Sequence, residues 1–214
     1  MDLKNKTVLV TGGTGSIGSE IVRQLLKQKA GKIIIFSRDD SKLFYLKNEL
    51  SSGRVKFVVG DVRDKNSLKR VFLEGIDIVI HAAALKHVSF CEEYPFEAVM
   101  TNVYGTQNVV DLSVEFDIDI MLTISTDKAV NPSSSMGATK YIAEKLTINA
   151  NRASAKTRFA CVRFGNVLGT RGSVIPAFLK SISEKGYIKV TDLEVTRFVM
   201  PIIDAAKLVT KALN

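Results

Sequence analysis

An acid and a base stand side by side in the stretch STDKAVNPSSSMGATKYIAEK, which runs from Ser125 to Lys145. Asp127 and Lys128 come one residue after an apolar run, residues 118–125, that is typical of a buried strand. In parallel sheets, ligands bind beyond the carboxyl ends of the strands, where this pair would lie. The pair suits proton transfer if its surroundings raise the carboxyl pKa and lower the amine pKa toward neutrality.

A second chemical motif, TGGTGSIG at residues 11–18, follows the first apolar run and opens a segment of helical pattern. Gly12 permits a tight turn, Gly15 lets a pyrophosphate approach the backbone, and Gly18 allows close packing of helix on sheet. Its place between a strand and a helix makes it a dinucleotide-binding candidate rather than a turn with incidental glycines. The cofactor contacts expected here come from Gly12, Thr14, Gly15, Ser16, Ile17 and Gly18.

The segment FSRDD, residues 36–40, ends the second apolar run and bears on which cofactor is bound. An acidic residue at this point binds the ribose hydroxyls of NAD, whereas an arginine accommodates the extra phosphate of NADP. Because Ser37 and Arg38 come first and Lys42 lies near, we expect NADP, with NAD as the alternative. The two aspartates that follow could instead serve as a helix N-cap.

Two further strand ends offer cofactor contacts. Asp61, in the segment GDVRD, could hydrogen-bond the adenine, and Val62 follows it. Three alanines in HAAALKH, Ala82, Ala83 and Ala84, would leave room for the cofactor backbone. Their alternative role is plain tight packing.

The elements that must position these groups alternate along the chain. Short apolar runs, typical of strands buried on both faces, are separated by segments whose apolar residues have helical spacing. The runs span residues 6–10, 32–36, 55–61, 76–84, 118–125 and 158–165. This alternation predicts an α/β fold with a doubly wound parallel sheet, the Rossmann arrangement, over residues 1–165.

The remaining residues, 166–214, follow a different pattern. A loop and a helix lead to two expected short strands, residues 187–190 and 196–200, and then to a closing helix at 202–214. We expect this part to form a partial, small substrate-binding lobe.

Composition excludes several classes of protein. The 214 residues carry a formal net charge of +8, but the basic residues are scattered, so we expect a small anionic ligand and no nucleic acid. Two cysteines, Cys91 and Cys161, without partner histidines predict neither a disulfide framework nor a metal site, and they fit a cytoplasmic location. No apolar run approaches the ~20 residues of a membrane span, and no signal peptide opens the chain.

Eight segments, in order along nearly the whole chain, resemble a family: the UDP-N-acetylglucosamine 4,6-dehydratases of the extended short-chain dehydrogenase/reductase superfamily. They are TGGTGSIG, GDVRD, HAAALKHV, TNVYGTQNV, STDKAVNP, MGATK, RFGNVLGTRGSVIP and VTDLEVTRF. The capsular polysaccharide biosynthesis branch is the most similar. The resemblance implies an NAD(P)-dependent lyase that moves a hydride from C4 of the hexose to bound cofactor, eliminates water across C5–C6, and returns the hydride to C6.

The same resemblance implies roles for individual residues. Asp127 would be the acid at the C6 oxygen and Lys128 the base at C5. Lys140 would bind the nicotinamide ribose and lower the pKa of whichever group accepts the C4 hydroxyl proton. The other implied contacts, to cofactor or to the UDP-N-acetylhexosamine substrate, come from Lys86, His87, Asn102, Asn166, Arg171 and Arg197.

Two registers compete for the tyrosine and lysine that this superfamily uses on a helix. Tyr141 and Lys145 have the Y-x-x-x-K spacing. Family members, however, place the tyrosine eight residues after the lysine of the S-T-D-K motif, here Lys128, and that position is occupied by Met136. Gly137 follows it, as a small residue should at the start of such a helix. We expect Met136 and Lys140 to hold the site, with Ile142, Leu146, Ala150 and Ala153 facing the core and Tyr141 toward the rim.

Met136 cannot accept a proton, because a thioether is only a weak hydrogen-bond acceptor. The first proton must then go to Asp127, to Thr126 as a relay, or to a water oriented by Lys140. The sequence leaves these three open. A related epimerase or reductase, or a cofactor-binding protein without catalysis, are the alternative functions. By analogy with the superfamily we also expect a homo-oligomer.

Overall fold

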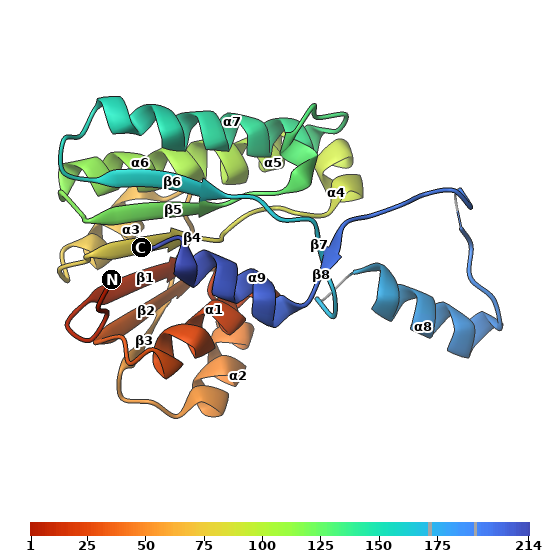
Figure 1. Cartoon of the computed structure of the whole chain (residues 1–214), viewed down its shortest axis with the longest axis horizontal. Coiled ribbons are helices and arrows are strands. Elements are labelled where there is room, and N and C mark those ends of the chain that lie inside the picture. The colour runs from red at the N-terminus through yellow and green to blue at the C-terminus, as the bar shows by residue number, and fades with distance from the viewer. Residues whose placement is uncertain (171–172, 191) are drawn as a thin grey trace.

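A six-stranded parallel sheet forms the centre of the computed structural model, which describes residues 1–170, 173–190 and 192–214 (Figure 1). The strands are β1 (Thr7–Thr11), β2 (Lys32–Ser37), β3 (Val55–Val59), β4 (Ile78–His81), β5 (Ile120–Ile124) and β6 (Arg158–Val162). Their order in the sheet is β3-β2-β1-β4-β5-β6, and neighbouring strands run parallel. The predicted doubly wound α/β fold is confirmed.

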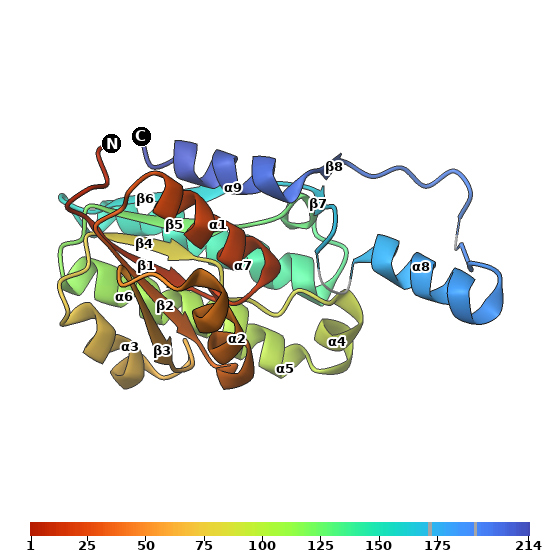
Figure 2. The ribbon, with the colours of Figure 1, turned by 90° about the horizontal axis from the view of Figure 1, so that it is seen from below.

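Helices connect the strands and cover both faces of the sheet. They are α1 (Ser16–Lys27), α2 (Asp40–Leu50), α3 (Lys65–Phe72), α4 (Val88–Glu93), α5 (Pro95–Ala98), α6 (Gly105–Glu115), α7 (Ser135–Asn149), α8 (Val174–Lys185) and α9 (Ile202–Lys211). A π-helix, η1 (Val99–Tyr104), and two 3₁₀ turns, η2 (Asp127–Ala129) and η3 (Ala150–Arg152), complete the connections. Figure 2 shows α1 and α9 on one side of the sheet and α3 and α6 on the other.

The sequence of β1 explains why both faces need helices. Val8, Leu9 and Val10 are all fully buried, although successive side chains of a strand point to opposite faces. Val8 and Val10 join the apolar cluster that α1, α2 and α9 cover, whereas Leu9 joins the cluster under α3 and α6. Each such side chain contributes roughly 1.5–3 kcal/mol through its burial. The two clusters therefore hold the strand ends, and the groups on them, in fixed positions.

The strand order reverses between β1 and β4, which lie side by side at the centre of the sheet. From β1 the chain winds outward through β2 to β3, then returns to β4 and winds the other way through β5 to β6. Ligands of such sheets bind at this switch point, beyond the carboxyl ends of the strands. The Gly-rich turn after β1, the alanines after β4 and the Asp-Lys pair after β5 all reach this edge.

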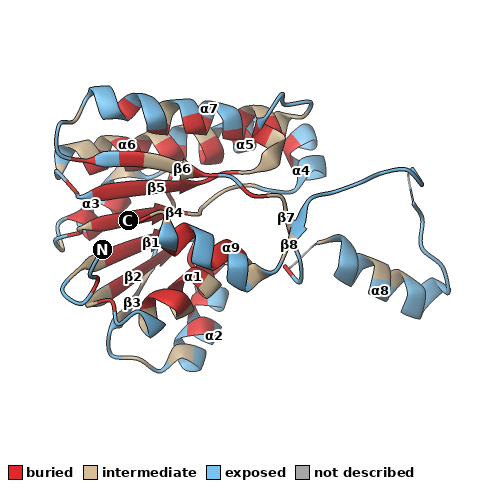
Figure 3. Cartoon of the chain, viewed as in Figure 1, coloured by how far each residue is buried: buried red, intermediate tan, exposed pale blue. Residues whose placement is uncertain are grey.

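The last part of the chain divides between the sheet and an outlying segment. Strand β7 (Asn166–Val167) pairs with β8 (Val199–Met200), and between them α8 projects away from the body with none of its residues buried (Figures 1 and 3). The prediction of a strand at residues 187–190 is wrong, since these residues pair with no strand in the described part of the chain. Of the expected strand 196–200, Val199–Met200 forms.

The closing helix returns to the body. Helix α9 packs against α1, and its Ala205, Ala206 and Val209 are fully buried in the cluster that also holds Ile21 and Leu25 of α1. Small alanines allow the two helices to approach closely. The expected closing helix is thus present, and it completes the cover on one face of the sheet.

Candidate active site

Four side chains meet just past the end of β5. The backbone N–H of Asp127, in η2, donates to the carbonyl of Phe164 at 3.1 Å, which connects this turn to the segment that follows β6. Lys128 Nζ donates to Asp127 Oδ1 at 3.1 Å and to Asn166 Oδ1 at 2.9 Å. The Thr126 hydroxyl donates to the same Asp127 oxygen at 2.9 Å. With about a third of each side chain exposed, Asp127 and Lys128 are held in place yet accessible.

The pKa of Asp127 lies below its ordinary value, opposite to the direction that would suit a proton donor. Burial works to raise this pKa, but hydrogen bonds from Lys128 and Thr126 outweigh it and hold the pKa below its ordinary value. The condition set above for the carboxyl, a raised pKa, is not met, because both close partners are donors and one carries a positive charge. Asp127 is therefore ionised at neutral pH and starts as a proton acceptor.

Lys140 lies behind this pair on the inner side of α7. Its residue is 6% exposed, and its Nζ donates to the carbonyl of Ile124 at 2.6 Å. Burial lowers the pKa of Lys140 to about 8, and the smaller effect of the Glu144 charge opposes this. An ammonium that titrates so close to neutrality can both hold a positive charge and give up a proton.

The start of α7 contacts the turn that carries Lys128. The Ser134 hydroxyl caps the helix by accepting from the N–H of Gly137 at 3.2 Å. A Cβ at Gly137 would collide with the carbonyl oxygen of Lys128, so a glycine is required for this approach. The small residue expected here is therefore explained by contact with the turn that carries Lys128.

Of the two competing registers, the structure favours the one with methionine. Met136 is 5% exposed and packs with Cys91 and Ala98, while Tyr141 is 39% exposed and its ring carries the Lys145 ammonium at 5.1 Å from the ring centre. Tyr141 therefore points outward, as expected for the rim. The assignment of Met136 and Lys140 to the reaction stays a prediction.

The prediction that Ile142 and Ala153 face the core is wrong. Ile142 is 43% exposed and Ala153 is exposed, although both were expected to face the core. The inner face of α7 carries polar side chains that find hydrogen-bond partners instead, so apolar spacing does not mark it. The buried residues of α7 are Met136, Gly137, Thr139, Lys140, Ala143, Glu144 and Thr147.

The Gly-rich turn has the geometry that a dinucleotide needs. Gly12 has a φ of +65°, and a Cβ there would come within 2.6 Å of the Ala83 nitrogen. A Cβ at Gly18 would collide with the Gly12 carbonyl, so helix α1 packs directly on the turn. Gly15, by contrast, is exposed and caps α1 without any side chain, which leaves its backbone open to an approaching pyrophosphate. These positions fit the predicted cofactor.

Two polar residues at the end of β2 and just after it, Ser37 and Asp39, make hydrogen bonds within the protein. Ser37 is buried and shares a hydrogen bond of 2.7 Å with Thr14 of the Gly-rich turn. Asp39 caps α2, accepting from the N–H of Lys42 at 2.9 Å. This is the alternative role considered for the aspartates, and it commits the Asp39 carboxylate to the helix.

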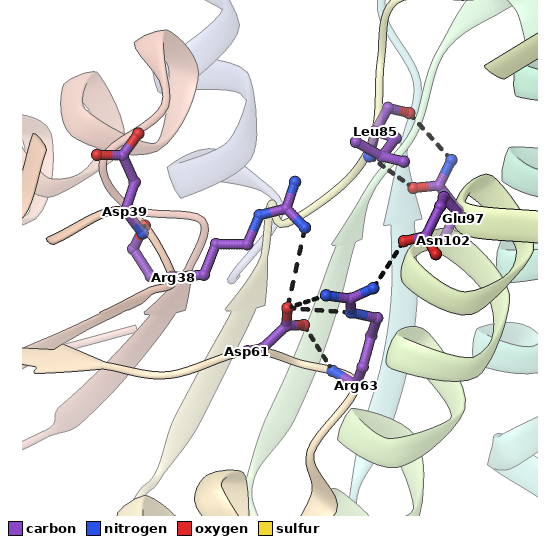
Figure 4. A network of polar contacts seen from close by, with 8 residues as sticks. Arg38, Asp39, Asp61, Arg63, Leu85, Glu97 and Asn102 are labelled. Carbon is purple, nitrogen blue, oxygen red and sulfur yellow. Dashed lines mark hydrogen bonds and ion pairs between the residues drawn. The ribbon is translucent and has the colours of Figure 1, made fainter. Parts of the chain in front are cut away.

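Asp61 gathers two arginines at the edge of this site (Figure 4). Arg63 donates to it from Nε at 3.0 Å and from Nη2 at 2.8 Å, and Arg38 Nη1 lies 3.8 Å from the same carboxylate oxygen. The other end of Arg63 reaches Glu97 at 2.7 Å. Burial acts to raise the pKa of Asp61, but the hydrogen bonds from Arg63 outweigh it, and the net pKa is lowered. The carboxylate therefore stays ionised and holds both cations.

Asn102 is fully engaged within the protein. From the π-helix η1 its Oδ1 accepts from the N–H of Leu85 at 2.8 Å, and its Nδ2 donates to the Leu85 carbonyl at 3.0 Å (Figure 4). The same Nδ2 also donates to the Thr139 hydroxyl at 3.0 Å. These bonds make the side chain a support within the protein, and its expected contact with the cofactor stays a prediction. The side chain fixes the loop that carries Lys86 and His87, both exposed, relative to α7.

His81, at the end of β4, is buried beside the switch point, and no sequence motif indicates its role. Thr106 donates to the Asn102 carbonyl at 2.6 Å, so its oxygen accepts from His81 Nε2 at 3.0 Å. Nδ1 is then the acceptor for the Thr11 hydroxyl at 2.7 Å. Burial, and secondarily the charge of Lys140, lower the pKa of His81 to about 3. The neutral ring thus joins the ends of β1 and β4 to η1 and α6.

The remaining predicted residues fall into three groups. Val62 is 4% exposed and packs in the core, while Ile17, Ser16 and the alanines after β4 are partly buried at the switch point. Arg197 is exposed, and its Nη1 donates to the neighbouring Thr196 carbonyl at 2.6 Å. Arg171 lies outside the described residues.

Three charged residues near the site escaped prediction: Arg63, Glu144 and Arg163. Glu144 follows Lys140 by four positions, a spacing that places both on one helix face and could have pointed to it. The contacts of Arg63 with Glu97 and of Arg163 with Glu144 join distant parts of the chain, and no local pattern signals them.

Comparisons with known proteins give a consistent result. A family model described as "Polysaccharide biosynthesis protein" matches residues 8–214. An uncharacterized membrane protein of Methanocaldococcus jannaschii is 52% identical over 98% of this chain and 63% of its own length. A UDP-N-acetylglucosamine 4,6-dehydratase (inverting) of Campylobacter jejuni is 43% identical, and a UDP-glucose 4-epimerase of Rickettsia bellii is 42% identical. The alignments cover 95% and 97% of this chain and 62% of each relative, so the chain spans less than two thirds of the length of all three relatives.

Solved structures show the same similarity. Pen from Bacillus thuringiensis superposes with a TM-score of 0.95 at 42% identity, over all of this chain and 66% of that one. DesIV, a dTDP-glucose 4,6-dehydratase of Streptomyces venezuelae solved with NAD and TYD bound, gives a TM-score of 0.86 at 25% identity, over 97% and 71%. Across the described residues, every helix is too short or too polar to cross a membrane.

Proposed function

The chain belongs to the polysaccharide biosynthesis protein family, and from that premise we propose that it is a nucleotide-sugar 4,6-dehydratase acting on UDP-N-acetylglucosamine. The observation that carries the proposal is the contact of Lys128 Nζ with both Asp127 and Asn166, at the carboxyl end of β5 and beside the buried Lys140. An acid–base pair at this place suits elimination across C5–C6. The similarity to the Campylobacter jejuni dehydratase supports the same reaction and substrate.

The cofactor in this proposal is NADP, with NAD as the alternative. When bound, the nicotinamide supplies a hydride acceptor for C4 and a hydride donor for C6. Arg38, with a side chain 52% exposed beside the switch point, is free of the helix cap that occupies Asp39 and could meet a 2′-phosphate. NAD in the DesIV structure supports a nicotinamide dinucleotide without distinguishing the two forms.

The chain's own groups supply the proton transfers. Asp127 starts ionised and accepts the C4 hydroxyl proton, directly or through the Thr126 hydroxyl that bonds it, since Met136 cannot. Protonated Asp127 then gives that proton to the departing C6 oxygen. Lys128, acting as the base, takes the C5 proton and returns it to C5 when the hydride adds to C6. The C4 hydroxyl proton leaves with the C6 oxygen as water, so both side chains end in their starting protonation states.

Substrate binding would fall to the groups around and beyond this pair. Lys86 and His87 on the loop after β4, Asn166 on β7, and Arg171 and Arg197 are the proposed contacts. A guanidinium fork matches the oxygens of a diphosphate, which suits both arginines to the UDP group. We keep residues 1–165 as the cofactor domain and residues 166–214 as a partial substrate lobe.

The outer face of α7 supports the proposed homo-oligomer. Tyr141, Ile142 and Ile148 are exposed on it, and a second copy of the chain would remove these apolar side chains from water. The oligomer stays a prediction, for which light scattering of the purified chain is the direct measurement.

Incubation of the purified chain with UDP-N-acetylglucosamine and NADP or NAD, followed by mass spectrometry, tests the proposal. A product lighter by one water supports dehydration. The second candidate, a 4-epimerase, is favoured by the similarity to the Rickettsia bellii protein and would give an isomer of unchanged mass. Cofactor binding without turnover would indicate a non-catalytic protein. The Asp127–Lys128 pair argues against the epimerase, because 4-epimerisation needs no base at C5.

A further inference from the structure

A buried carboxylate lies one helical turn beyond Lys140. Glu144 is 5% exposed, and residues four apart in a helix share one face, so both side chains point to the inner side of α7. Arg163, just after β6, donates from Nε to one carboxylate oxygen at 2.7 Å and from Nη2 to the other at 2.5 Å. Such a two-point contact fixes the position and plane of the carboxylate.

The ionisable groups around Lys140 come from three elements and are mostly uncharged. His81 on β4 is neutral, since its pKa is about 3. Burial raises the pKa of the Cys161 thiol on β6 to about 11, so this group too is neutral where Lys140 titrates. Glu144 is ionised. Burial acts to raise its pKa, but the hydrogen bond from Arg163 leads the opposing effects, and the net pKa is lowered. Among these neighbours, Glu144 therefore supplies the negative charge.

We propose that Glu144, held in place by Arg163, is a positioning residue that keeps the buried Lys140 protonated under working conditions. The inference rests on the proposed function, in which a charged Lys140 binds the nicotinamide ribose and favours release of the C4 hydroxyl proton. Burial alone favours the neutral amine, and a fixed carboxylate on the same helix face opposes it.

Stability alone is a weak reason for this carboxylate. Burying an ionised carboxyl costs desolvation energy that its attraction to a cation only partly offsets, and the Arg163 side chain is 48% exposed. A pair placed only to join α7 to β6 would work as well at the surface. The position of Glu144 one helical turn from Lys140 instead allows its carboxylate to stabilise the Lys140 ammonium.

Direct titration of Lys140 tests the proposal without any substrate. In the full chain labelled with ¹³C at lysine Cε, the Lys140 signal is the one lost in Lys140→Met. Glu144→Gln should lower its apparent pKa by about one unit, as expected when a neighbouring opposite charge is removed. Arg163→Met should raise it, because Glu144 then acts on Lys140 without a competing cation.

Opposite shifts distinguish this role from a structural one, which would disturb both variants alike. Glu115→Gln, which removes an exposed carboxylate paired with Lys69, is the matched control and should leave Lys140 unchanged. Glu144→Asp keeps the charge and should restore the wild-type titration, and it serves as the folded comparison if Glu144→Gln is unstable. The same Lys140 titration in wild type, Glu144→Gln and Arg163→Met would overturn the proposal.

The activity measurement separates this inference from the proposed function. The alkaline limb of the dehydration rate should move down by about one pH unit in Glu144→Gln and up in Arg163→Met. A wild-type chain with no dehydration activity contradicts the proposed function, whereas the NMR titration still decides the role of Glu144. Normal activity with an unmoved pH profile in both variants contradicts the positioning role alone.

Discussion

The sheet edge around Lys140 and the projecting segment around α8 both carry residues expected to bind ligand, but they differ in what holds those residues. At the sheet edge, Lys140 and Asn102 are almost completely buried, and each makes hydrogen bonds to backbone atoms. In the projecting segment, Leu193 and Phe198 are 88% and 84% exposed (Figure 3). The chain's own core therefore positions the proton-transfer groups, while the sugar-binding groups proposed around Arg197 lack such support.

Removal of the base should give the largest effect. Lys128→Ala should lower the dehydration rate about 10³-fold, within the range for a lost acid–base group, because neither Asp127 nor Asn166 can take the C5 proton in its place. The rate of formation of the product lighter by one water measures this. The fold should persist, since the side chain is about a third exposed.

Tyr141→Phe is the matched control on the outer face of the same region, and it should keep dehydration within about twofold of wild type, as for surface changes remote from a site. The tyrosine ring is exposed and contacts Lys145. A large loss in Tyr141→Phe would contradict the register that places Met136 and Lys140 in the site.

Leucine truncation compares the packing of the two regions directly. Leu25→Ala in α1, where the side chain is fully buried against the sheet, should lower the free energy of unfolding by about 3 kcal/mol. Leu179→Ala in α8, which is 64% exposed, should change it by less than about 0.5 kcal/mol. Urea unfolding of both variants measures the difference. A comparable loss in Leu179→Ala would mean that α8 is covered in solution, for example by a second copy.

The contrast also explains what the sequence could predict. Strands such as β1 were predictable because they are buried on both faces and read as continuous apolar runs. Gly12 and Gly18 were predictable because local backbone geometry requires them. Residues 187–190 have a strand-like composition, but a strand also needs a partner, and composition does not supply one.

The misread parts of the site depend on contacts between distant residues. Ile142 was assigned to the core from apolar spacing, yet α7 buries Lys140 and Glu144 because Ile124 and Arg163 provide their partners. Burial alone would raise the pKa of Asp127, but its direction is set by the donors that surround the carboxylate. Such partners become visible only when the strand order is known.

The buried charge of Lys140 should appear in the pH dependence of stability. Its pKa in the folded chain is about 8, below the ordinary lysine value of 10.5, so the unfolded chain binds more protons between these values. Stability of the wild type relative to Lys140→Met should therefore rise between about pH 8 and 10, by roughly 2 kcal/mol. Denaturant unfolding of both proteins across this range measures the difference. A constant difference across the range would show that Lys140 is not buried as a titrating group.

A change of cofactor preference should distinguish an arginine at the sheet edge from one in the projecting segment. Arg38→Gln removes the guanidinium proposed to meet the 2′-phosphate, so the preference for NADP over NAD should fall about tenfold, which corresponds to ~1.4 kcal/mol. Arg197→Gln makes the same chemical change in the projecting segment and should leave both cofactor affinities unaltered. Fluorescence titration with NADPH and NADH measures all four affinities. An equal loss for both cofactors in Arg38→Gln would assign Arg38 to the support of Asp61, and unchanged affinities for both would show that Arg38 does not meet a 2′-phosphate.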